Sequence, residues 1–92
     1  MTRRQTTLIE LEGASEELAT ASSSARRERA KVTLWVCHLY LNSAADWIKV
    51  GKTIEANENL DRAREFLGPL RTRASRLALA RLEAIGRLPN QL

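Results

Sequence analysis

Hydrophobic residues recur along most of the chain at the spacing of an α-helix. The clearest case lies between residues 25 and 50, where Leu34, Leu41 and Ile48 share one face at about 100° per residue. The same spacing predicts further helices over residues 7–21, 53–67 and 69–86. Because no segment alternates like a β-strand, the pattern predicts an all-α fold. We expect a single domain, residues 1–92, built as a small bundle of three to four helices.

Turn and cap signals set the expected helix boundaries. Thr7, with a glutamate three positions later, fits a capping box, so we expect the first helix to start there and residues 1–6 to be disordered. The serines at 22–24 predict a break, although one long continuous helix is an alternative. Gly51 suits the end of the second helix, and Gly68-Pro69 predicts that the third helix ends there and that the proline opens the fourth.

The predicted helix at 25–50 is apolar over more than half of its circumference. Such a helix must be covered on two or three sides, so we expect either the other helices or another subunit to surround it. Trp47 is expected in the core. A narrower polar stripe, which also carries a tryptophan, is the partner surface that this interpretation favours. That surface consists of Trp35, His38, Asn42 and Asp46.

Residues 37–70 predict a central helical hairpin. The first helix carries an aromatic, a small residue and a second aromatic, a glycine lies in the turn, and two alanines lie seven positions apart on the second helix. These residues are Tyr40, Ala44, Trp47, Gly51, Ala56 and Ala63. The pattern resembles a single tetratricopeptide-like (TPR-like) repeat. The resemblance implies antiparallel helices that pack closely through small residues, and a role in protein binding; a generic hairpin is the alternative.

The chain has a formal net charge of +4, and its charges occur in blocks of alternating sign. Such blocks most simply pair with each other, so we expect the cations at 26–31 to bind Glu16 and Glu17. The alternative is that arginine clusters bind a polyanion, either nucleic acid or a phosphorylated small ligand. The residues of that alternative site are Arg26, Arg27, Arg29, Arg73, Arg76 and Arg87.

Arg81 stands apart from the other arginines, because it falls within the apolar stripe of the last predicted helix. A buried arginine needs a carboxylate or carbonyl partner. The expected partners are Asp61, Glu65 or a group on a neighbouring subunit.

The sequence offers little chemistry for catalysis. One histidine and one cysteine are too few for a zinc site or an internal disulfide, and no phosphate-binding glycine loop or nucleophile motif is present. We expect no catalytic residue, no cofactor, no metal, no membrane span, and a reducing, cytoplasmic location. The prediction is a non-catalytic protein–protein interaction module, such as an adaptor, small chaperone, assembly factor or inhibitor. We expect it to form a homo-oligomer or to bind another protein.

Overall fold

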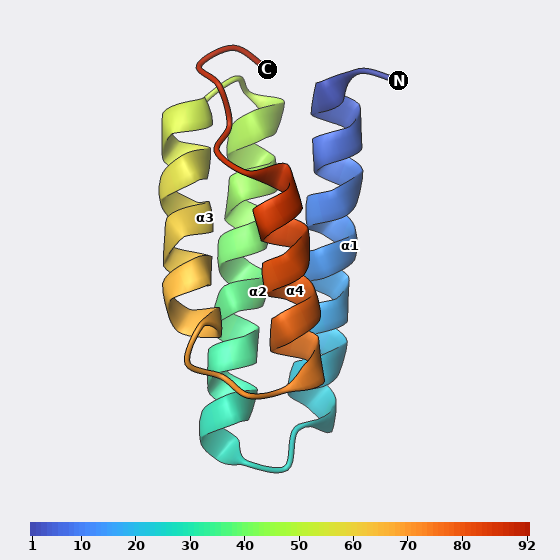
Figure 1. Ribbon diagram of the computed structural model, residues 1–92, viewed down its shortest axis with the longest axis vertical. Coiled ribbons are helices and arrows are strands. Elements are labelled where there is room, and N and C mark those ends of the chain that lie inside the picture. The colour runs from blue at the N-terminus through green and yellow to red at the C-terminus, as the bar shows by residue number, and fades with distance from the viewer.

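The protein folds as a bundle of four α-helices. The computed structural model describes residues 1–92 and contains no strand. The helices are α1 (Arg3–Ser24), α2 (Glu28–Lys49), α3 (Thr53–Leu67) and α4 (Arg73–Ile85). α2 lies in the centre, α1 and α3 run antiparallel to it on either side, and α4 lies in front of this layer, packed on α1 and α3 (Figure 1). The predicted all-α bundle is confirmed.

The first helix begins earlier than predicted. Its N-cap is Thr2: the Gln5 amide donates to Thr2 Oγ1 at 3.1 Å, and the Thr2 amide donates to Gln5 Oε1 at 2.8 Å. This reciprocal pair satisfies two amides that the helix leaves free, so α1 starts at Arg3. The predictions that residues 1–6 are disordered and that Thr7 caps the helix are therefore wrong. Thr7 is a buried residue inside α1.

A break does separate the first two helices, but the serines at 22–24 do not form it. They make the last turn of α1, and the chain leaves the helix at Ala25. The hydroxyls of the second and third serines donate to carbonyls four residues back. Ser22 donates to Lys31 O at 2.7 Å. Serine is accommodated here because each hydroxyl finds a nearby carbonyl acceptor.

The two remaining turns differ in how well the sequence predicts them. Gly51 follows α2 with φ of 79°, a left-handed conformation that favours glycine, as expected. Pro69, however, does not open the last helix. The Ser75 amide donates to Thr72 Oγ1 at 3.1 Å and the Thr72 amide donates to Ser75 Oγ at 3.2 Å. This capping box makes Thr72 the N-cap, so α4 begins at Arg73.

The core lies where the predicted apolar faces meet. The helical spacing correctly predicts the following buried residues: Leu11, Leu18, Leu34, Cys37, Leu41, Ala44, Ile48, Ala56, Leu60, Ala63, Leu67, Ala78 and Leu82. Ala44, Ala56 and Ala63 are fully buried, and such small side chains let neighbouring helices approach closely. α4 contributes only Ala78 and Leu82 to the fully buried hydrophobic set, so it is the helix with the least apolar anchoring.

Arg81 fastens α4 to α1. Its Nη1 lies 3.3 Å from Glu10 Oε2, and its Nη2 lies 2.7 Å from Glu17 Oε1. Gly13 lies between these glutamates on α1, and a Cβ there would stand 3.1 Å from the guanidinium, so glycine leaves room for the arginine. The prediction that Arg81 binds a carboxylate of α3 is wrong, because α4 presents this side chain to α1.

The C-terminal tail folds back onto α3. Asn57 Nδ2 donates to Leu88 O at 3.0 Å, and the Leu88 amide donates to Asn57 Oδ1 at 2.9 Å. The Leu88 side chain is buried in the core cluster. A pair of hydrogen bonds from one buried side chain therefore holds the tail in place.

Candidate functional site

The side of α2 that points away from the core is apolar and uncovered. α4 lies at the front of the bundle (Figure 1). Four large hydrophobic side chains of α2, and that of Val50 directly after its last residue, are 39% to 66% exposed. We call these residues the outer face of α2: Val32, Trp35, Leu39, Trp47 and Val50. The prediction that Trp47 lies in the core is wrong. It projects about 100° away from its neighbour Ile48, which takes the core position.

His38 and Asn42 of α2 are tied to α1 through Ser15. His38 Nδ1 lies 2.9 Å from Ser15 O and 2.7 Å from Ser15 Oγ. The Ser15 hydroxyl lies 2.8 Å from Asn42 Oδ1, and Asn42 Nδ2 lies 3.3 Å from His38 Nε2. Ser15 is buried, whereas Asn42 is exposed and His38 is half-buried. The three side chains thus form a closed hydrogen-bonded ring across the α1–α2 contact.

The contacts of this ring use most of the polar atoms of its three side chains. A carbonyl oxygen only accepts, so His38 Nδ1 is the donor in its contact with Ser15 O. The Ser15 hydroxyl donates to Asn42 Oδ1. The three side chains therefore bind mainly one another and the backbone of α1.

Of the other two predicted partner residues, Trp35 belongs to the outer face of α2 and Asp46 borders it. The Trp35 ring contacts the His38 ring at a tilt of 39°, with ring centroids 4.6 Å apart, and Trp35 is 47% exposed. Asp46 is exposed and lies 4.0 Å from Lys49, which also binds Glu12 of α1 at 3.5 Å. Trp35 and Asp46 are therefore available to a partner, whereas the polar atoms of His38 and Asn42 are largely occupied within the chain.

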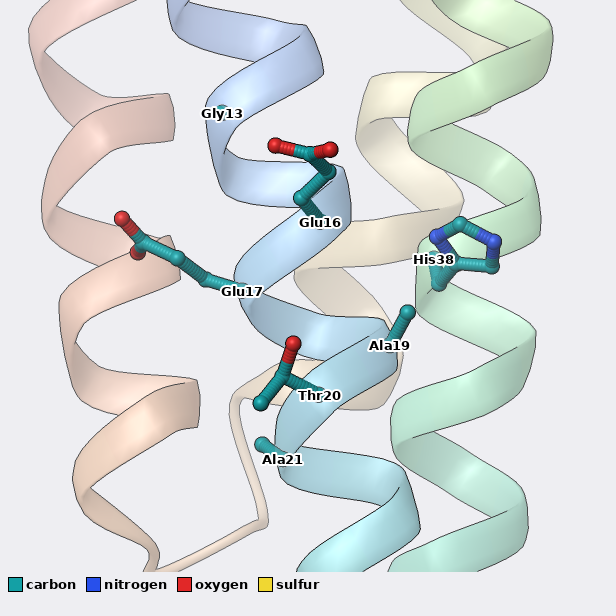
Figure 2. Close-up of a pocket in the computed structure, with 7 residues that line it drawn as sticks. All are labelled: Gly13, Glu16, Glu17, Ala19, Thr20, Ala21 and His38. Atoms are coloured by element: carbon teal, nitrogen blue, oxygen red, sulfur yellow. The ribbon is translucent and has the colours of Figure 1, made fainter.

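A depression of about 790 Å³ lies over α1 beside His38 (Figure 2). Glu17 points from it toward α4, where it binds Arg81, and Glu16 projects on the His38 side. No group of three or more histidine, cysteine, aspartate or glutamate side chains is placed to hold a metal ion. The depression thus brings together one free carboxylate and one imidazole that is already hydrogen-bonded. It does not assemble a larger set of reactive groups.

The structure gathers most of the predicted anion-binding arginines at one end of the bundle. The α1–α2 and α3–α4 connections both lie at that end, opposite the two termini (Figure 1). These connections and the adjoining helix starts carry Arg26, Arg27, Arg29, Arg73 and Arg76. Arg87 lies in the C-terminal tail and binds Asp61 at 3.6 Å, so it is not part of this group.

The expected pairing of the cations at 26–31 with Glu16 and Glu17 is wrong. None of those cations makes an ion pair, because Glu17 binds Arg81 and Glu16 binds none of them. Sequence reasoning also missed Arg71, which joins the basic end. Its place just after Gly68-Pro69, in a connection rather than on a helix face, was the signal that could have identified it.

Comparisons of the chain with protein-family models, with curated proteins and with solved structures find no significant match. None of the four helices combines the length and the apolar character needed to cross a lipid bilayer.

Proposed function

We propose that this protein is a non-catalytic interaction module that associates with a second copy of itself through the outer face of α2. The observation that carries the proposal is the exposure of five large hydrophobic side chains, two of them tryptophans, along one side of the central helix. Monomeric proteins seldom expose large contiguous apolar patches. Tryptophan is also among the side chains that most often dominate interface energies.

The available area fits a modest interface. If each aromatic side chain offers up to about 250 Å², half-exposed residues of the outer face contribute on the order of 400 Å² per copy. A standard interface buries about 800 Å² per partner, so polar neighbours such as Asp46 and Lys49 would form the rest. We expect the pair to form with a dissociation constant in the micromolar range, which corresponds to a binding free energy of about −8 kcal/mol.

The charge distribution favours an antiparallel pair. In a parallel pair, the basic ends of the two copies would lie next to each other and repel. In an antiparallel pair the two basic ends lie apart by nearly the long dimension of the bundle, 40 Å, far beyond the Debye length of about 8 Å. If the twofold axis of the antiparallel pair passes at the level of residue 41, Val32 of each copy lies beside Val50 of the other copy. This follows because Val32 and Val50 are equally far from residue 41 along the chain.

The α2–α3 hairpin supports the same class of function. Fully buried alanines on both helices and the stacked rings of Tyr40 and Phe66, with centroids 5.9 Å apart, are the kind of packing expected of a TPR-like unit. A single unit leaves a face without a neighbour, because repeats of this type bury apolar surface by stacking. The second copy would supply that neighbour. Cys37 is a free thiol, which suits the proposed cytoplasmic location.

The test is the mass of the protein in solution, measured by size-exclusion chromatography with light scattering at about 100 µM, well above a micromolar dissociation constant. The wild type should elute as a dimer at both low and high salt, because salt screens interactions between charges and does not weaken an apolar contact in this way. Leu39→Glu should elute as a monomer. Leu77→Glu is the matched control: Leu77 on α4 is 49% exposed and Leu39 is 47% exposed, so this variant should stay dimeric.

A monomeric wild type at this concentration would overturn the proposal. It would also be overturned if both glutamate variants dissociated equally, since that result would trace association to general hydrophobicity rather than to the outer face of α2.

A further inference from the structure

A basic pocket lies at the end of the bundle that is opposite the termini. It encloses about 550 Å³ between the start of α2 and the α3–α4 connection. Arg27 and Arg29 line one side, and Arg71 and Thr72 line the other. Both connections lie at the same end of the bundle in Figure 1, and their residues line the pocket together. Three arginines that are far apart in the sequence thus converge on one cavity.

The positive charge of this pocket is not neutralised within the chain. Arg27, Arg29 and Arg71 make no ion pair, and no acidic side chain lines the cavity. Further cations without an ion pair lie close to the lining residues along the chain, with Glu28 as the one acidic residue among them: Arg26, Lys31, Arg73 and Arg76. By contrast, the arginines elsewhere on α3 and α4, such as Arg64 and Arg81, bind carboxylates. Like charges gathered on one surface repel one another, so a bound anion would relieve this repulsion.

We propose that this pocket binds an oligophosphate group, meaning two or more phosphates held close together in one molecule, either directly linked or joined through sugars. Arginine presents a planar set of donors that matches phosphate oxygens in pairs. Three arginines around one cavity suit several closely spaced negative charges better than a single carboxylate. No aromatic side chain lines the pocket, so a nucleobase finds no stacking surface there.

The proposal does not rest on self-association. In an antiparallel pair the two pockets would lie at opposite ends of the dimer, clear of the outer face of α2. The same phosphate chemistry has two sources: a free oligophosphate, or the backbone of a single-stranded nucleic acid. The surrounding cations would extend the contact in the second case.

The experiment uses the full chain and two probes, inorganic tripolyphosphate in titration calorimetry and a fluorescein-labelled oligothymidylate in fluorescence anisotropy. Both are measured at about 50 mM salt and again at about 200 mM salt. Binding at the lower salt should weaken at the higher one by roughly tenfold or more, because a few phosphate contacts release bound counterions.

The variants are Arg71→Gln and Arg27→Gln, which remove one charge each and leave a shorter, polar and uncharged side chain at an exposed position. Each should weaken binding by about fivefold, the effect expected for a partly solvated ion pair. The matched control is Arg3→Gln, which removes another exposed arginine without an ion pair, at the far end of the bundle. It should change binding less than about twofold. Circular dichroism checks that each variant is folded.

Binding of tripolyphosphate that depends on Arg71 supports the proposal with a free oligophosphate as the source. Binding of the oligonucleotide alone, with the same dependence, supports it with a nucleic-acid backbone as the source. The proposal is overturned if neither probe binds at the lower salt. It is equally overturned if Arg3→Gln weakens binding as much as Arg71→Gln, since net charge and not the pocket would then explain the affinity.

Discussion

The attachment of α4 should depend on Leu82 more than on any other side chain of that helix. Leu82 is fully buried, and the other buried hydrophobic residue of α4 is the much smaller Ala78. Replacing a buried leucine by alanine costs about 2–5 kcal/mol, depending on how far the surroundings close the cavity. α4 lies at the edge of the core and has room to settle, so we expect Leu82→Ala to cost about 2–3 kcal/mol.

The expected loss from Leu82→Ala is large compared with the total free energy of unfolding. At about 0.05–0.15 kcal/mol per residue, a chain of this length has a free energy of unfolding of about 5–14 kcal/mol. Urea unfolding followed by circular dichroism should show it as a fall in the midpoint of about 2 M, for a denaturant slope near 1 kcal/mol/M. Leu77→Ala is the control on the same helix, because half of that side chain is exposed; it should cost under about 0.5 kcal/mol.

A cost below about 1 kcal/mol for Leu82→Ala, or equal costs for the two variants, would refute the reasoning. Either result would mean that ion pairs or the tail, and not this one buried side chain, hold α4 on the bundle.

Three further predictions concern single side chains. Arg81→Gln should destabilise the protein by about 1 kcal/mol, because its partners are partly exposed, and the cost should shrink in a Glu17→Gln background, as a double-mutant cycle in urea would show. Burial raises the pKa of the Cys37 thiol from 9.0 to about 11. The unfolded thiol therefore loses its proton first, and stability should fall by up to about 2 kcal/mol as pH rises through that interval; Cys37→Ser should remove this part of the slope in urea midpoints. Asn57→Ala should cost about 1–3 kcal/mol, because it leaves a buried amide unpaired, and amide hydrogen exchange at Leu88 should accelerate.

Much of the fold is predictable from the sequence because helical spacing is a local property. The faces that contain Leu41, Leu60 and Leu82 are buried as the spacing predicts. Gly51 correctly predicts the turn after α2, because a left-handed backbone conformation is unfavourable for residues that have a Cβ. The starts of α1 and α4 were mispredicted for a related reason. Several threonines have a possible partner three residues on, including Thr7 with Glu10. The structure forms the reciprocal pair at Thr2 and at Thr72, whereas Thr7 is buried inside α1.

The candidate sites were less predictable, because they depend on contacts between distant segments. The four residues of the polar stripe on α2 were identified correctly as neighbours on one helix face. The residues around His38 and Asn42 in the sequence do not indicate that Ser15 of α1 would form hydrogen bonds with both of them. The pairing of Arg81 with α1 joins residues that are more than sixty positions apart. Which carboxylates Arg81 binds depends on where α4 packs against the other helices.

The sequence by itself determined the helices, their apolar faces and the excess of cations, since each follows from residue identity and the helical repeat. Only the tertiary structure decided which apolar surface stays exposed. α4 packs at the front, across α1 and α3, and covers one side of the central layer. Trp35, Leu39 and Trp47 therefore remain at the surface. Tertiary structure also brought Arg27 and Arg71 to one pocket, because two connections meet at the same end of an antiparallel bundle.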